Sequence, residues 1–238
     1  MITACAFVPS TPLLIPEVAS GAASELEDLR RAAIDAVGRA VGSADRVVII
    51  GAGAETRLFI DAVGTMAGFG VPVTVAVRPH GEAISAEPTN QLGVAATLGV
   101  WLLDQTTHSG SRSVLEIAID ENQKRIDEIA AEISSSSDSI ALVVVADGSA
   151  ARTEKAPGYL HPDAIAFDVL VEAALTTGDA QALAALDQAQ AQAVISSGWP
   201  AWHVAGLAMA SHDVKASFDR FDATYGVGYF VATWILVS

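Results

Sequence analysis

The sequence predicts an α/β protein in which a mixed, mostly parallel central sheet lies between two layers of helices, giving three layers in all. Strand-like and helix-like segments alternate through the first two thirds of the 238 residues. Several strand-like segments are almost wholly apolar, which is typical of strands covered on both faces. Two strand-like segments near the end predict the antiparallel part of the sheet. We see no internal repeat, and we expect residues 1–238 to form a single domain.

The predicted strands are short apolar runs that end at glycine, proline or polar residues. Ile140–Val145 (IALVVV) and Arg46–Ile50 (RVVII) are the clearest central strands. Ile2–Val8 is predicted as a buried strand that ends at Pro9. The other expected strands are Val71–Val77, Ser113–Ile117, Val214–Phe221 and Gly226–Val237.

The predicted helices are segments rich in Ala, Leu, Gln and Glu with apolar residues at helical spacing. They are Ala22–Val41, Thr89–Leu103, Glu121–Ile133, Ala164–Leu175, Asp179–Ala191 and Pro200–Met209. Asn90 is a candidate helix cap, and Pro200 stands at a favourable first-turn position. The three prolines of Pro9–Val18 predict a rigid loop after the first strand.

The composition indicates a folded chain and excludes several classes of partner. Hydrophobic residues make up 51% and charged residues 17%, which argues against disorder. Because acidic residues outnumber basic ones 28 to 13, for a net charge of −15, we expect no nucleic-acid partner and no anionic membrane partner. Tyr229–Val237 is too short an apolar run to span a bilayer, and the N-terminus lacks a basic leader. We therefore expect a cytoplasmic protein. The single cysteine, Cys5, excludes an intrachain disulfide and reads as a small buried hydrophobe.

Four polar or glycine-rich segments are candidates for a binding site, because ligands of open α/β sheets bind beyond the carboxyl ends of the strands. They are Pro9–Pro12, Gly51–Arg57, Asp147–Arg152 and Ile195–His203. We expect these segments to converge on one pocket. Its candidate residues are Ser10, Thr11, Gly51, Glu55, Asp147, Ser149, Ala150, Arg152, His161, Ser196, Ser197 and His203.

The histidines do not form a recognisable metal motif, since neither HxH nor HxxxH occurs. His80 and His108 are expected at the surface. His161 and His203 fall in or near the candidate segments and are the histidines expected to contact a ligand. Asp147 ends the clearest strand, where it is either a general base or a turn cap.

The segment Gly51–Thr56 (GAGAET) has two glycines of a dinucleotide fingerprint but threonine at the third place. We interpret these glycines as a tight turn beside another loop. Glu55 and Arg57 are either pocket residues or an exposed ion pair. The sequence contains no serine-hydrolase elbow and no P-loop, kinase or zinc-finger signature.

Several segments resemble the class III extradiol ring-cleavage dioxygenases. Phe7–Val18 (FVPSTPLLIPEV) is similar to their N-terminal VPHPPLLIPEV motif. Ala146–Asp168 is similar to their later GD-x-S-H segment, and its ADGSA looks closest to a subunit-B-like subgroup that carries GDGSA. Thr176–Asp187 and Tyr225–Ala232 also look like family segments, so the resemblance runs nearly end to end.

The resemblance implies a single α/β domain, and in active members an Fe(II) ion held by two histidines and one carboxylate, with another histidine as acid/base. In this sequence the first histidine position falls at Ser10 and the second within Gly51–Ala54. The acid/base position falls at Ala150, and the third ligand position near Ser196 or Ser197. These residues supply neither imidazole nor carboxylate, so we expect a degenerate metal site and no bound cofactor.

The leading hypothesis is therefore a catalytically altered or inactive homologue that binds a small molecule or a partner. One alternative is an active, metal-dependent (Fe or Zn) ring-cleavage enzyme whose ligands are recruited from Glu55, Asp147, His161 and His203. Another alternative is an interaction subunit or homo-oligomer, for which Trp199–Met209 is a candidate contact face unless it is buried in the core.

Overall fold

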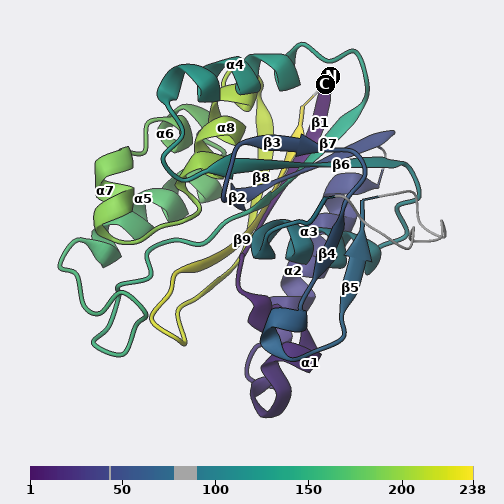
Figure 1. Ribbon diagram of the computed structural model, residues 1–238. Helices are drawn as coiled ribbons and strands as arrows, with labels where there is room; N and C mark the ends of the chain where they lie inside the picture. Colours follow the sequence, from purple (N-terminus) through teal and green to yellow (C-terminus); the bar gives the residue numbers. More distant parts are fainter. Residues whose placement is uncertain (43, 78–89, 238) are drawn as a thin grey trace.

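The protein is described by a computed structural model that covers residues 1–42, 44–77 and 90–237. Its centre is a seven-stranded mixed sheet in the order β3-β6-β2-β7-β1-β9-β8, with helices on both faces (Figure 1). The predicted α/β class and mostly parallel mixed sheet are confirmed. Our expectations for His80 and for the start of a helix at Thr89 lie outside the described residues.

The four central strands of the sheet are parallel. They are β1 (Ile2–Val8), β7 (Ile140–Val145), β2 (Arg46–Gly53) and β6 (Ser111–Ala118). The three outer strands are antiparallel to their neighbours: β9 (Tyr229–Leu236), β8 (Val214–Asp222) and β3 (Arg57–Phe59). A separate two-stranded sheet joins β4 (Val63–Thr65) to β5 (Thr74–Ala76). The expected strand Val71–Val77 is therefore shorter than predicted, since only Thr74–Ala76 is extended and paired.

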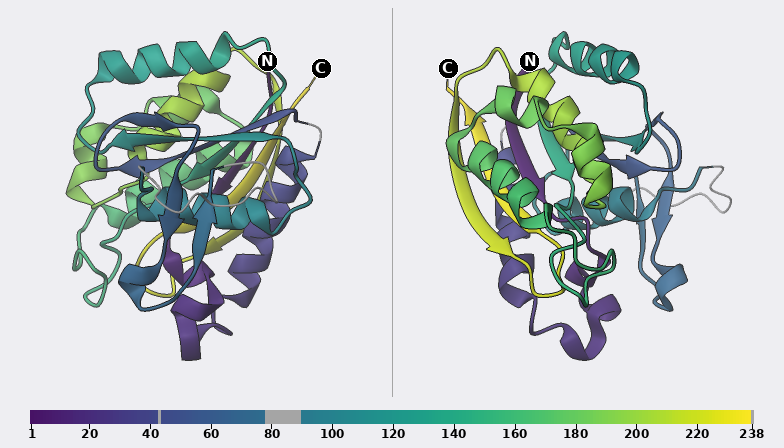
Figure 2. Two further views of the ribbon diagram at one scale, coloured as in Figure 1. Left: turned by 45° about the vertical axis from the view of Figure 1, so that its right-hand side comes forward. Right: turned by 90° about the vertical axis from the view of Figure 1, so that its left-hand side faces the viewer.

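Two hydrophobic clusters fill the space between the sheet and its helices, one on each face. The helices are α1 (Pro16–Ala19), α2 (Glu27–Val41), α3 (Val94–Asp104), α4 (Gln123–Ser134), α5 (Ala164–Thr177), α6 (Ala180–Ala184), α7 (Gln188–Ala193) and α8 (Trp199–Met209). Helices α2 and α3 cover one face, while α4 and α8, with α5 to α7 around them, cover the other (Figure 2). Successive side chains of a strand point to opposite faces, so a strand such as β7 must be apolar throughout.

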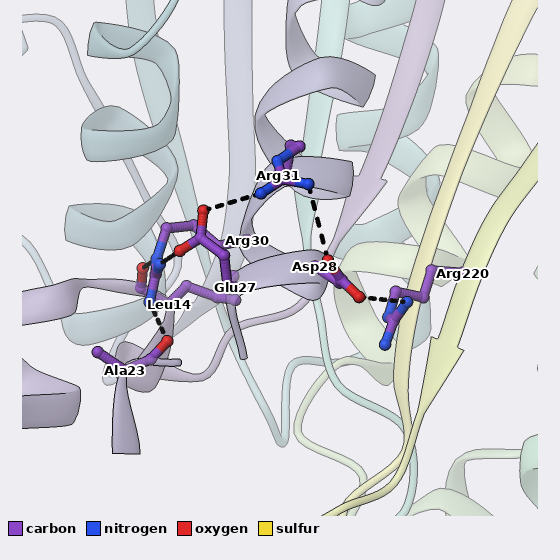
Figure 3. A network of polar contacts seen from close by, with 7 residues as sticks. All are labelled: Leu14, Ala23, Glu27, Asp28, Arg30, Arg31 and Arg220. Carbon is purple, nitrogen blue, oxygen red and sulfur yellow. Dashed lines mark hydrogen bonds and ion pairs between the residues drawn. The ribbon is translucent and has the colours of Figure 1, made fainter. Parts of the chain in front are cut away.

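The first long helix starts at Glu27 rather than at Ala22, and the buried Arg30 shows why. Its guanidinium donates to the carbonyl oxygens of Leu14 at 2.6 Å and of Ala23 at 3.0 Å, and also to Glu27 (Figure 3). These bonds hold the preceding turn and the proline-rich loop against α2. That loop is more regular than expected, because its prolines start a 3-10 turn at Pro12–Leu14 and helix α1.

Two other helices differ from expectation because of their caps. Helix α3 begins at Val94 after Gly93, while Asn90 accepts a bond from Arg57 at 2.6 Å instead of capping the helix. The segment Asp179–Ala191 is two short helices rather than one. The side chains of Asp179 and Asp187 each accept from a backbone amide at 2.8 Å and begin a new helix.

Helix α8 lies in the core, since Trp202 is 1% exposed and most of its neighbours on the helix are equally buried. Trp199–Met209 is therefore part of the core and does not form the contact face that the sequence allowed as an alternative. Cys5 is also buried, as expected. Across the described residues, no helix combines the length and the apolar character that a bilayer crossing requires.

Candidate functional site

The carboxyl ends of β1 and β7 bring Ser10 and Asp147 together. Val8 pairs with Val145 in the parallel register, so the residues that follow these strands lie side by side. The Ser10 amide donates to Oδ1 of Asp147, and the Ser10 hydroxyl donates to Oδ2, both at 2.7 Å. A serine with its own amide thus forms a two-point clamp on one carboxylate.

The segment before α8 closes over the same point. The Ser196 hydroxyl donates to the backbone oxygen of Asp147 at 3.0 Å. A Cβ atom at Gly198 would stand only 2.6 Å from that oxygen, so the close approach requires glycine. Three of the four predicted segments therefore converge at the end of β7.

The Asp147 carboxyl has an unusual proton affinity. Its pKa is raised from 3.8 to about 6, mainly by burial and in smaller part by the negative charge of Asp168, while the two bonds from Ser10 lower it. The residue as a whole is partly buried, and its carboxyl oxygens face the Ser10 amide and hydroxyl. A carboxyl group that titrates close to neutrality can accept or release a proton at a binding site.

Thr11 and Tyr229 add hydroxyl groups to this edge of the sheet. Tyr229 lies on β9 next to β1 and is 3% exposed, and Thr11 is 6% exposed. Burial and then the charge of Asp147 raise the pKa of Tyr229 to about 12, while a hydrogen bond with Thr11 lowers it. The phenol therefore stays protonated and available as a donor.

A second buried carboxylate, Asp168, lies behind the first. It projects from α5, is 1% exposed, and accepts from the Ser149 amide at 2.7 Å and hydroxyl at 2.8 Å. The Arg152 guanidinium also donates to it at 2.5 Å, so the buried negative charge is compensated. Arg152 in turn lies over the ring of Phe221, 5.0 Å from its centroid.

Glycines make room for the Asp168 carboxylate. A Cβ atom at either Gly148 or Gly228 would stand 2.5 Å from one of its oxygens. Asp168 was not among the predicted site residues. The available signal was its place beside Phe167 and three residues before Val171, on the buried stripe of an apolar helix, where an acid requires a partner.

The end of β2 is where the second histidine position of the resembled family falls. A buried glutamate from the neighbouring strand, Glu116, lies there beside the glycines. Glu116 on β6 is 4% exposed and accepts from the Gly93 amide at 2.6 Å. Burial raises the pKa of Glu116. A Cβ atom at Gly53 would stand 2.6 Å from this side chain, and one at Gly51 would stand 3.1 Å from Ala95. The glycines of GAGAET therefore allow close packing. Like Asp168, Glu116 was not among the site residues predicted from the sequence.

Glu55, His161 and His203 have partners of their own. Glu55 is exposed and forms an ion pair with Arg57 at 3.7 Å. The Nδ1 atom of His161 accepts from the Asp163 amide at 3.2 Å. His203 lies on α8 with Nε2 2.7 Å from Nε2 of Gln123 on α4, and burial lowers its pKa.

Of the remaining predicted residues, Ala150 is held by its backbone and Ser197 lies in the turn before α8. The Ala150 amide donates to Val194 at 3.0 Å, and its carbonyl accepts from Gly158 at 2.8 Å. Both Ala150 and Ser197 are partly buried. Within residues 1–42, 44–77 and 90–237, no three His, Cys, Asp or Glu side chains are grouped so that they could hold a metal ion.

The side chains at the expected ligand positions do not fit Fe(II). Ser10 donates its hydroxyl hydrogen to a carboxylate, and the Gly51–Ala54, Ala150 and Ser196–Ser197 positions offer no imidazole and no carboxylate.

Comparison with known proteins supports the fold. No protein-family model and no curated protein sequence matches the chain. The crystal structure of the uncharacterized protein JW3007 from Escherichia coli K12 is similar, with a TM-score of 0.51 and 13% sequence identity over 98% of this chain and 99% of that chain. At this identity the likeness shows the α/β fold alone.

Proposed function

We propose that this chain is a catalytically altered relative of the class III extradiol dioxygenases, of the subunit-B-like type, that binds a small molecule at the carboxyl edge of its sheet without Fe(II). One observation carries the proposal. At the position of the family's first imidazole, Ser10 donates to Asp147 through both its amide and its hydroxyl. The proposal places the protein in the cytoplasm.

The polar groups at this edge suggest the character of the ligand. Ser10, Thr11, Ser196 and Tyr229 provide hydroxyl groups around Asp147. An ionised Asp147 accepts hydrogen bonds from ligand hydroxyl or ammonium groups and repels anions. The net charge of −15 also favours a neutral or cationic ligand over nucleic acid.

Elemental analysis and a ring-opening assay test the loss of iron chemistry. We expect less than stoichiometric iron and zinc in the purified protein, and no ring-opened product from catechols after anaerobic addition of Fe(II). A tightly held stoichiometric metal, or a ring-opened product whose formation Asp147→Asn abolishes, would overturn the proposal in favour of the metal-dependent enzyme.

Catechol itself is the first probe for the binding role. We expect saturable binding to the wild-type protein by NMR or calorimetry, weakened about tenfold in Asp147→Asn, the scale of one charge-assisted contact. Asp213→Asn removes an exposed aspartate elsewhere and should leave the affinity unchanged. Equal affinities of the two variants would place the binding site away from Asp147.

A second candidate function, the interaction subunit, is favoured by an exposed apolar face around α5. Ile165, Val169 and Leu170 on this helix are each more than half exposed. Tyr159, Leu160 and Ile195, in the segments that precede α5 and α8, are also at least half exposed. Together these six side chains expose on the order of 500 Å², the size of patch that often marks a contact site.

We propose a second copy of this chain as the occupant of that face. The six side chains are uncharged, so burying them against a second copy removes apolar surface from water without desolvating a charge of their own. Size-exclusion chromatography with light scattering should show a dimer that Leu170→Glu dissociates. Ile60→Glu is the control, because Ile60 is 73% exposed and lies outside the face. A wild-type monomer at all concentrations would exclude this second function.

A further inference from the structure

A pocket of about 330 Å³ lies between β3 and α4, on the face of the sheet that α4 and α8 cover. Val48, Leu115 and Ile140 from three neighbouring strands form its floor, and their side chains are buried. Ile129 and Ile133 of α4 and Leu58 of β3 form its apolar walls. Arg46 begins β2 and pairs with Ile140, whereas Asp147 follows the other end of β7, so this pocket is separate from the Ser10–Asp147 edge.

Three arginines line this pocket, which is unusual in a chain with only 13 basic residues and a net charge of −15. Arg46 comes from β2, Arg57 from β3 and Arg125 from α4. One acid, Glu132, is present among the described lining residues. The lining therefore combines an apolar interior with a local excess of positive charge.

The carboxylates that pair with these arginines belong to exposed side chains. Arg46 lies 3.7 Å from Asp138, and Arg125 donates to both Glu128 and Glu132 at 3.3 Å. The corresponding pair of Arg57 is the 3.7 Å contact with Glu55 described above. Exposed pairs of this kind stabilise a protein little and exchange readily with other anions.

Neutral groups fix two of the guanidinium groups without neutralising them. Arg46 donates to the Ser113 hydroxyl at 3.2 Å, and Arg57 donates to the Asn90 side chain at 2.6 Å. Arg57 also lies over the Phe59 ring, 4.8 Å from its centroid. The cationic groups are therefore held in place while keeping capacity for an incoming carboxylate.

We propose that this pocket binds a small carboxylate with an apolar body, either an aromatic acid or a medium-chain aliphatic acid. The carboxylate pairs with the arginines, and the apolar body covers Val48, Leu115 and Ile140. This site goes beyond the function proposed above, because it uses different residues and a ligand of opposite charge preference. Its volume is within the range of small-ligand pockets.

Benzoate and octanoate, each compared with its neutral counterpart benzamide or 1-octanol, test the proposal by calorimetry and methyl NMR. We expect one acid to bind saturably with one-to-one stoichiometry and its neutral counterpart to bind at least about tenfold more weakly. Whichever of benzoate and octanoate binds more tightly identifies the ligand as aromatic or aliphatic. Methyl shifts should be confined to the residues that line the pocket, which are Val48, Leu58, Leu115, Ile129, Ile133 and Ile140.

Two adjacent residues of α4 provide a matched pair of variants. Arg125→Gln should weaken acid binding about tenfold, while Lys124→Gln removes the same charge from a side chain that is 87% exposed and outside the pocket, and should leave binding unchanged. Equal binding of acid and neutral compound, equal effects of the two variants, or no saturable binding of either acid at millimolar concentration overturns the proposal. Methyl shifts at the Ser10–Asp147 edge instead would overturn it as well, whether or not the variants fold.

Discussion

The Asp147 carboxylate accepts two hydrogen bonds from Ser10, one from the amide and one from the hydroxyl, each 2.7 Å long. The two residues are 137 positions apart in the chain, so the pair joins the ends of β1 and β7. The same contact supports the sheet edge and defines the proposed binding site. Changes to it should therefore alter both stability and proton affinity.

Replacing Ser10 with alanine should lower the free energy of unfolding by about 1 kcal/mol, because one partly buried hydrogen bond is lost. It should also raise the pKa of Asp147 above about 6, since the lost bond favours the ionised form. Urea denaturation at pH 8 and an NMR titration measure the two effects. Ser217→Ala is the control, because its hydroxyl makes a similar bond to Asp219 at 3.0 Å on the exposed surface. Equal losses of stability in the two variants would contradict a special role for Ser10.

Stability should fall as the pH rises through the titration of Asp147. Its pKa rises from 3.8 to about 6 on folding, so the folded protein holds the proton more tightly than the unfolded chain does. The resulting stabilisation is fully present below about pH 4 and is lost as the pH passes about 6, a change of about 2–3 kcal/mol at most. Asp147→Asn removes this component. The difference between the unfolding free energies of the two proteins from pH 4 to pH 8 gives the measurement, and a difference that does not change with pH would refute the shifted pKa.

Removing the cation beside Asp168 should be costly. Arg152→Met leaves a carboxylate that is 1% exposed without its opposite charge, and we expect a loss of about 3 kcal/mol in chemical denaturation. Arg31→Met is the matched control. Arg31 is an exposed residue of α2 whose pairs with Glu27 and Asp28 lie at 3.4 and 3.7 Å, and its loss should cost less than about 1 kcal/mol (Figure 3). Similar losses in both variants would mean that Asp168 is well satisfied by Ser149 alone.

Two glycine-to-alanine changes should have effects of opposite sign. Gly228→Ala puts a methyl group 2.5 Å from the Asp168 carboxylate. It should lower the free energy of unfolding by about 1–3 kcal/mol, which is measured as a lower melting temperature. Gly38→Ala places its methyl group in open space within α2 and should stabilise the protein by about 0.5–1 kcal/mol through helix propensity. Stabilisation by both changes would show that the Asp168 pocket is looser than its geometry indicates.

The central sheet was predictable because its strands are nearly uniform in character. Ile2–Val8 and Ile140–Val145 were predicted with the bounds that the structure has. The split between α6 and α7 was harder to foresee, because Asp187 could be a polar helix residue or a cap. Only its side-chain bond to the Gln190 amide distinguishes the two.

The candidate site was predictable where residues directly follow strands, as Ser10 and Asp147 do. It was not predictable where a partner comes from a distant helix or the middle of a strand. Asp168 on α5 and Glu116 on β6 look like ordinary acids in the sequence, and their role depends on glycines at positions 148, 228 and 53. The position of Asp168 on an apolar helix stripe indicates that it needs a partner, but the sequence does not show which residues provide it.

The place of β1 in the sheet has a consequence for biosynthesis. This first strand pairs with β7 on one side and with β9 on the other, through contacts such as Cys5 with Leu142 and Cys5 with Trp234. During synthesis the N–H and C=O groups along both edges of β1 lack their native partners until β7 and then β9 have been made, so we expect late completion of the sheet and a need for protection of this strand against non-native pairing.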